Sequence, residues 1–165
     1  MGQLILMRHA KSDWNDAAAT DHDRTLNDRG RRDAPRMATW LLQQTELPEL
    51  ILASTAVRVS QTLDLLMTSW PSQPPVHPLE SLYLAAPETI LRTLQTDTLG
   101  LSRVMIVAHN PGLQMLANQL AGQQFDFPTA AIAIFDFDNI DWTQLSHSTP
   151  ARLSAFGTPK GITTS

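Results

Sequence analysis

The chain contains no cysteine, which excludes disulfide bridges and thiolate metal sites. It also lacks the G-x-x-x-x-G-K-[ST] loop that cradles nucleotide phosphates, so ATP-driven transfer chemistry is not expected. No apolar run approaches the length of a bilayer span, and no basic segment leads into a long apolar stretch near the N-terminus. We therefore expect neither membrane attachment nor a signal peptide, and we expect a cytoplasmic protein.

The chain also lacks an excess of positive charge, and its formal net charge is −4 at pH 7 with His neutral. A nucleic-acid-binding domain needs a basic face, so nucleic acid is not an expected partner. Asp136, Asp138 and Asp141 lie close together late in the chain, but they lack the ordered spacing and the glycine of a calcium loop. We expect a solvated turn there rather than a metal site.

The length of 165 residues fits one domain, and a hydrophobic content of 42% is enough for a buried core. Short apolar runs predict four strands: residues 4–7, 50–53, 76–79 and 103–108. Apolar residues at helical spacing predict four helices: residues 30–45, 56–69, 87–96 and 111–121. The alternation of the two predicts an α/β fold with three layers, in which helices flank a mostly parallel sheet.

Two further strands are expected after the last helix. Residues 130–137 alternate weakly, which indicates an antiparallel strand or an edge strand, and residues 151–156 form a last strand candidate. Residues 157–165 are rich in Gly, Pro, Thr and Ser and predict a loose tail. No internal repeat or linker divides the chain, so residues 1–165 are expected to form a single domain.

Arg8 and His9 directly follow the first predicted strand. In open α/β sheets, ligands bind outside the carboxyl ends of the strands. A neutral imidazole can attack phosphorus as a nucleophile, and a guanidinium can hold phosphate oxygens in a fork. The pair therefore favours phosphoryl chemistry, although for this dipeptide alone a histidine that merely caps the strand is the alternative.

Charged or titratable side chains also follow the later predicted strands. Arg58 falls in the first turn of the helix after the second strand, where a cation opposes the helix dipole unless an anion is held there. His109 follows the fourth strand, and Glu80 follows the third. If the strands are parallel, these three residues join Arg8 and His9 at one edge of the sheet.

The polar stretch of residues 11–29 is long for a loop in a compact domain, and such loops often carry function. Arg24 is a candidate to add positive charge near the strand ends. Ser12 and Asn110, next to Arg8–His9 and His109 in sequence, are further candidates for substrate contacts.

Four segments carry a resemblance to a known family: residues 6–12 (LMRHAKS), 23–30 (DRTLNDRG), 54–62 (STAVRVSQT) and 107–112 (VAHNPG). In this order they resemble the histidine phosphatase superfamily, which has the phosphoglycerate-mutase-like fold, and within it the small SixA-type phosphohistidine phosphatases. The resemblance implies a mixed sheet flanked by helices and no requirement for a metal ion or another cofactor. One departure is Thr25, where the family often has Pro.

The residues and the resemblance together predict a mechanism. His9 attacks the substrate phosphorus and becomes a phosphohistidine, which water then hydrolyses. Arg8, Arg58 and His109 hold the phosphate oxygens and stabilise the transition state. Glu80 is the candidate general acid for the leaving group.

The expected substrate is a phosphohistidine side chain on another protein, for example a phosphotransfer protein. Only a short helical segment separates Glu80 from His109, which leaves little chain for a lid over the site. Two alternatives stay open: a phosphatase of the same fold that acts on small phosphoesters, and a phosphate-binding module without catalysis. We expect a monomer.

Overall fold

Short apolar strands form the centre of the protein, which we describe from a computed structural model covering residues 1–17 and 19–162. The strands of these residues are β1 (Gly2–Arg8), β2 (Leu50–Ser54), β3 (Val76–Leu79), β4 (Arg103–Ala108), β5 (Ile132–Phe137) and β6 (Arg152–Gly157). The helices are α1 (Asp28–Gln44), α2 (Val57–Ser69), α3 (Pro87–Asp97) and α4 (Gly112–Ala121), with short 3-10 helices η1 (Glu80–Leu82) and η2 (Trp142–Gln144).

The strands pair in one sheet in the order β3-β2-β4-β1-β5-β6. β3, β2, β4 and β1 are parallel to their neighbours, whereas β5 pairs antiparallel with both β1 and β6. The predicted mostly parallel α/β sheet is confirmed. β5 is antiparallel, which is one of the two expected alternatives, but it is not at the edge because β6 covers its outer side.

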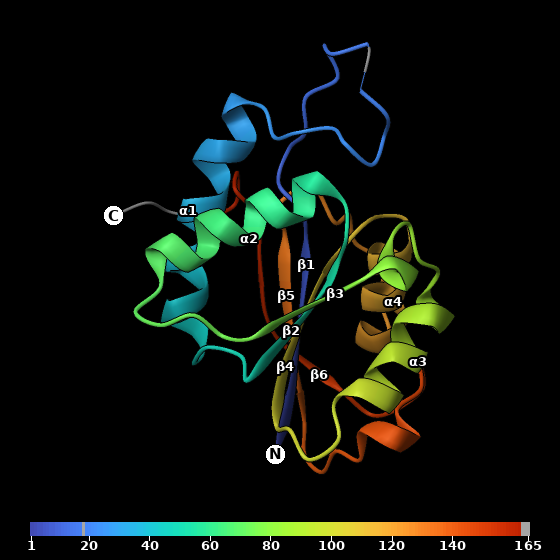
Figure 1. The fold of residues 1–165 in the computed structure, drawn as a ribbon. Helices are drawn as coiled ribbons and strands as arrows, with labels where there is room; N and C mark the ends of the chain where they lie inside the picture. Colours follow the sequence, from blue (N-terminus) through green and yellow to red (C-terminus); the bar gives the residue numbers. More distant parts are fainter. Residues whose placement is uncertain (18, 163–165) are drawn as a thin grey trace.

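Helices cover both faces of the sheet, so the protein has three layers (Figure 1). Leu4 and Leu6 point into the core beneath α3 and α4, whereas Ile5 and Met7 point into the core beneath α1 and α2. These four consecutive side chains are fully buried, which explains the apolar run in the middle of β1. Each such side chain contributes roughly 1.5–3 kcal/mol to the free energy of unfolding.

The strand register brings the functional candidates to one edge of the sheet. Arg8 at the end of β1 pairs with Ala108 at the end of β4. Ala53 of β2 pairs with Val107 of β4, and the last residue of β2 pairs with the last residue of β3. The four parallel strands therefore end together, as the sequence predicts.

The segment from Gly157 onward is not a loose tail in the described residues. Gly157 ends β6 and is buried against the ring of Trp40, and the carbonyl of Pro159 accepts a hydrogen bond of 3.0 Å from Arg36 Nη2. Ile162 packs against the core beneath α1 and α2. The prediction was wrong here because composition does not reveal these contacts; residues 163–165 lie outside the described residues.

In the part of the chain that the structure describes, no helix combines the length and the apolar composition that a membrane span requires.

The start of α1 is anchored to the loop that follows β1. Asn27 caps the helix by accepting a hydrogen bond of 2.9 Å from the backbone N–H of Gly30. A Cβ atom added at Gly30 would lie 2.2 Å from the carbonyl oxygen of Lys11. Only glycine allows the helix and the loop backbone to approach this closely.

We expect Gly30→Ala to lower the free energy of unfolding by about 1–3 kcal/mol, because the added methyl group forces the loop backbone away. Denaturant unfolding of the purified variant measures the change. Gln43→Ala, at an exposed position of the same helix, is the matched control and should stay within about 0.5 kcal/mol of the wild type. Equal stability of Gly30→Ala and the wild type would contradict the proposed close packing.

Candidate active site

A cavity of about 210 Å³ opens at the carboxyl ends of β1 and β4. The structure brings seven of the predicted site residues to its lining: Arg8, His9, Ser12, Arg24, Arg58, His109 and Asn110. Five further residues complete the lining: Lys11, Trp14, Asp21, Leu84 and Thr129. Three guanidinium groups and two imidazoles thus surround one small space, which suits a phosphoryl dianion.

His9 lies directly after β1 and is only 6% exposed. Its Nδ1 lies 2.7 Å from the carbonyl oxygen of Ala10, so we assign the ring proton to Nδ1. Nε2 then keeps its lone pair and accepts a hydrogen bond of 3.3 Å from Arg58 Nε. Burial, aided by the positive charges nearby, lowers the pKa of His9 to about 3. His9 is therefore neutral at physiological pH, as a nucleophile must be.

Arg58 joins the other parts of the site. It is 2% exposed and extends from the first turn of α2. Its Nη2 lies 3.3 Å from His109 Nδ1 and 3.2 Å from Asp21 Oδ2, while Nη1 donates to the backbone carbonyl of Asp21 at 2.6 Å. A carboxylate therefore compensates the unfavourable position of this cation at a helix N-terminus.

His109 follows β4 and is 2% exposed. Because Nδ1 faces a donor on Arg58, we assign the ring proton to Nε2, which donates to Ser54 Oγ at 2.7 Å. Burial, followed by the charge of Arg58, lowers the pKa of His109 to about 4. His109 is thus a neutral ring that is held by Ser54 at the end of β2. The sequence did not indicate this role for Ser54.

Arg8 keeps donors that are available to a ligand. Its Nη1 donates to the carbonyl oxygen of Phe127 at 3.3 Å. Its Nε is buried and has no partner among the described residues. A buried donor without a partner is costly, so an anion in the cavity would relieve this cost.

Asp21 is the functional candidate that sequence reasoning missed. Its Oδ1 accepts hydrogen bonds from Arg24 Nε at 3.2 Å and Arg24 Nη2 at 2.9 Å, and its Oδ2 accepts from Arg58 and from the Tyr83 hydroxyl. The bond from Tyr83 and those from the two arginines hold the pKa of Asp21 well below its usual range. The spacing of Asp21 and Arg24, three residues apart, is the one hint in the sequence.

Ser12 and Asn110 line the cavity but are bonded to the protein. Ser12 Oγ accepts a hydrogen bond of 2.5 Å from Arg24 Nη1. Asn110 donates from Nδ2 to Phe127 at 2.8 Å, and its Oδ1 accepts from the backbone N–H of Gln114 at 3.2 Å. Both residues position their neighbours, and a direct contact with substrate stays a prediction for them.

Glu80 is the one predicted site residue that the structure does not bring to the cavity lining. It is exposed at the start of η1, where the chain turns Leu82 inward to the core. Tyr83, the next residue after η1, reaches the site instead: its hydroxyl donates to Asp21 and its ring lies edge-on to His109, with 5.4 Å between centroids. The role of Glu80 as general acid stays a prediction.

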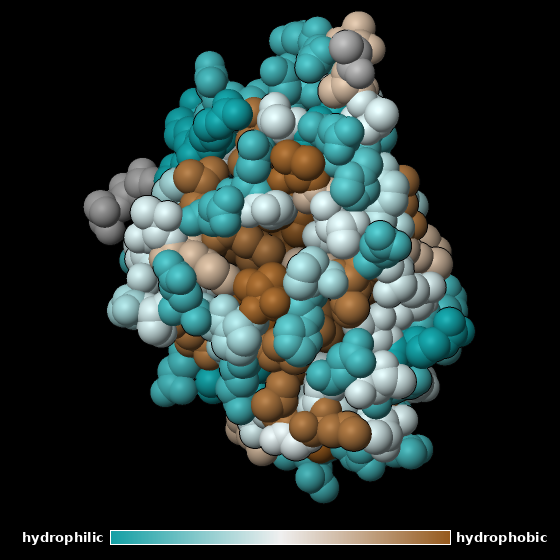
Figure 2. Space-filling model, in the orientation of Figure 1, coloured by the Kyte–Doolittle hydropathy of each residue, from teal (hydrophilic) through white to brown (hydrophobic). Residues whose placement is uncertain are grey.

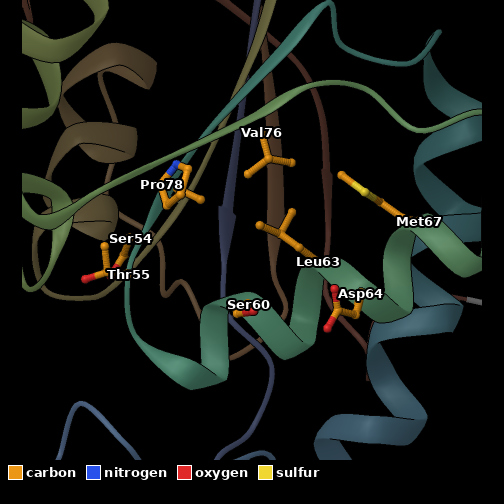
Figure 3. Close-up of a pocket in the computed structure, with 9 residues that line it drawn as sticks. Ser54, Thr55, Ser60, Leu63, Asp64, Met67, Val76 and Pro78 are labelled. Carbon is orange, nitrogen blue, oxygen red and sulfur yellow. The ribbon is translucent and has the colours of Figure 1, made fainter.

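A larger cavity of about 390 Å³ lies between α2 and β3. Leu63, Met67, Val76 and Pro78 give it an apolar lining, whereas Asp64 is its charged residue (Figure 3). Apolar side chains gather on the surface around it (Figure 2). It has no guanidinium or imidazole in its lining, so the smaller cavity is the candidate phosphate site despite its size.

The comparisons with known proteins agree with this geometry. The family model of the histidine phosphatase superfamily (branch 1) matches residues 4–83. An uncharacterized protein of Mycobacterium leprae is 32% identical over 167 residues, which cover 93% of this chain and 100% of the relative.

Solved structures give the same result. A SixA structure from Agrobacterium tumefaciens is 28% identical, with a TM-score of 0.81 over 96% of this chain and 98% of that chain. A protein histidine phosphatase SixA complexed with tungstate is 25% identical, with a TM-score of 0.79 over 96% and 97% of the two chains.

The sheet, the neutral histidines and the arginines that surround them form a candidate phosphate site of the histidine phosphatase kind. The chain belongs to the histidine phosphatase superfamily, branch 1. Within the superfamily it is of the SixA type, which supports phosphatase activity.

The lowered pKa values of the two histidines predict how stability depends on pH. The unfolded chain, in which a histidine titrates near 6.5, binds more protons than the folded chain below that pH. Stability is therefore full above pH 6.5 and is lost as the pH falls, by roughly 2 kcal/mol per histidine at pH 5.

Denaturant unfolding at pH 7 and pH 5 measures this loss. His9→Asn should reduce the loss between the two pH values, because the variant has one fewer buried imidazole. His77→Asn, at an exposed position of β3, should keep the pH dependence of the wild type. An identical pH dependence in His9→Asn and the wild type would show that burial does not hold His9 neutral.

Proposed function

We propose that the protein removes the phosphoryl group from phosphohistidine on a partner protein, through a phosphohistidine intermediate at His9. One observation carries this proposal: the lone pair of a buried, neutral His9 Nε2 faces the cavity residue Arg58 at 3.3 Å. An incoming phosphoryl group that takes the place of this contact has the nucleophile on one side and a guanidinium beside it.

Charge stabilisation falls to the arginines, beside which His109 lies as a neutral ring. Arg8 offers its unpartnered Nε, and Arg58 offers the Nε–Nη2 edge that now contacts His9 and His109. These donors would hold the oxygens of the transferred group while negative charge is spread over them in the transition state. The positive charge of these side chains supports chemistry that needs no metal ion.

The mouth of the cavity supports a macromolecular substrate. A space of about 210 Å³ is small, so it accommodates a phosphoryl group and its attached ring while the body of the substrate stays outside. Trp14 is 69% exposed and Leu84 is 54% exposed, and both line the cavity. Exposed apolar side chains of this kind fit the surface of a partner protein.

The substrate class is tested with a histidine-phosphorylated phosphotransfer protein and a panel of small phosphomonoesters. We expect kcat/KM to be at least ~100-fold higher for the phosphoprotein, because only that substrate covers the exposed mouth. Faster turnover of a small ester would assign the protein to the phosphomonoesterases of this fold. Binding of the phosphoprotein without turnover would indicate a phosphate-binding module.

The intermediate is tested by rapid acid-free denaturation after mixing the enzyme with substrate labelled at the phosphoryl group. We expect a protein-bound label that is stable in alkali and labile in acid, as a phosphoramidate is, and that is absent from His9→Ala. The same variant should lose at least ~10³-fold in kcat. His147→Ala, in an exposed loop, should keep both the label and the rate; a label that persists in His9→Ala would refute the role of His9.

A further inference from the structure

The carboxylate of Asp21 belongs to the lining of the candidate phosphate cavity. It accepts hydrogen bonds from Arg24 and Arg58, the two arginines that line the cavity together with Arg8. Asp21 belongs to the loop between β1 and α1, and its side chain is 43% exposed. One carboxylate thus neutralises much of the positive charge that would otherwise face a substrate.

A phosphoryl dianion and the Asp21 carboxylate compete for the same donors. Arg58 Nη2 lies 3.2 Å from Asp21 Oδ2, and the fork of Arg24 is directed at Oδ1. If the dianion takes these donors, Asp21 loses its cations and gains a doubly charged neighbour. Both changes favour the protonated form of a carboxyl group.

We infer that Asp21 is a general acid of the reaction: it takes up a proton when the phosphoryl group replaces it on Arg58 and Arg24, and it then protonates the leaving group. This inference rests on the proposed function, because a leaving group exists only if the protein is a phosphatase. It assigns to Asp21 the role that the sequence predicts for the exposed Glu80.

The other groups around Asp21 are compatible with this role. Arg58 faces it from α2, and Arg24, His22 and Asp23 belong to its own loop. Tyr83 faces it from the segment after η1, where burial and Asp21 itself raise the pKa of the phenol and keep it protonated at neutral pH. His109 faces the same cavity after β4 as a neutral ring, because burial lowers its pKa.

The proton balance closes over one turnover. His9 Nε2 forms a bond to phosphorus while the bond from phosphorus to the leaving nitrogen breaks, and the proton of Asp21 passes to that nitrogen. Water then attacks the phosphohistidine, the P–N bond to His9 breaks, and Asp21 accepts the proton that water loses. When inorganic phosphate leaves, Asp21 returns to Arg58 and Arg24 and releases the proton.

The first test counts protons without any turnover. Calorimetric titration with tungstate at pH 7–8, in two buffers of different ionisation enthalpy, gives the number of protons bound with the anion. We expect net uptake in the wild type, less uptake in Asp21→Asn, and wild-type uptake in Glu80→Gln. The same uptake in Asp21→Asn and the wild type would overturn the inference, whatever the enzymatic activity.

The second test separates acid catalysis from positioning. Asp21→Asn keeps an oxygen for Arg58 and Tyr83 but has no acidic proton. We expect it to lose about 100-fold in kcat on phosphoserine, whose alkoxide is a poor leaving group, and less than 10-fold on p-nitrophenyl phosphate. An equal loss on both substrates would show that Asp21 only positions the arginines.

Tyr83→Phe is a second variant in case Asp21→Asn folds poorly. It removes one donor to the carboxylate and leaves the ring against His109, so proton uptake on tungstate binding should extend to higher pH. Uptake that is unchanged in Tyr83→Phe would also contradict the inference. A wild type that binds tungstate with proton uptake but hydrolyses no substrate would instead refute the proposed function.

Discussion

The guanidinium of Arg58 is the group on which the site depends. It contacts His9, His109 and Asp21, which come from three separate segments of the chain. At 2% exposure, an arginine is stable only if its donors are satisfied and its charge is compensated. The first turn of α2 supplies the position, and the three partners supply the acceptors, so Arg58 couples these three segments of the site to one another.

This arrangement also explains why the histidines are neutral. Burial alone disfavours the charged imidazole, and the neighbouring guanidinium adds to this effect. His9, which needs its lone pair to attack, thus lies beside Arg58, the cation that the phosphate requires. Because the charge of Arg58 favours the neutral imidazole, the two roles are compatible. The arginine that prepares His9 for attack can also stabilise the charge that develops on the transferred group.

The sequence predicts the part of the site that depends on strand ends. β1 and β4 each contain an apolar run that is followed abruptly by polar residues, so Arg8, His9 and His109 can be placed by the rule for parallel sheets. Arg58 can be found because a cation is unfavourable in the first turn of a helix. Glu80 follows a strand in the same way, but η1 turns it outward, and no periodicity in the sequence specifies that turn.

Ser54 and Asp21 could not be placed for a different reason. A serine between a strand and a helix is equally suited to cap the helix, so its bond to His109 depends on the packing of β2 beside β4. Asp21 depends on the path of a long loop, which has no repeating pattern of apolar residues. Its functional contacts are with residues far away in sequence, such as Arg58 and Tyr83.

The loop that carries Asp21 is fixed at its base and bound to the site near its middle. At the base, the N–H of Asp13 donates to the carbonyl of Thr25 at 2.7 Å, and the N–H of Asn27 donates to the carbonyl of Lys11 at 3.0 Å. Proline in place of Thr25 would keep that carbonyl, so the departure from the family pattern leaves the base intact.

Near its middle, the loop is held by the bonds that Asp21 makes to Arg58 and Tyr83, and the first of these is a bond that a phosphoryl group would take. In the proposed reaction, binding of substrate exchanges one anion for another on the same arginine instead of adding a new charge beside it. That exchange requires the loop segment around Asp21 to move, whereas the base of the loop is packed against Gly30. In this way the proposed exchange on Arg58 would couple the presence of the phosphoryl group to the protonation state of Asp21.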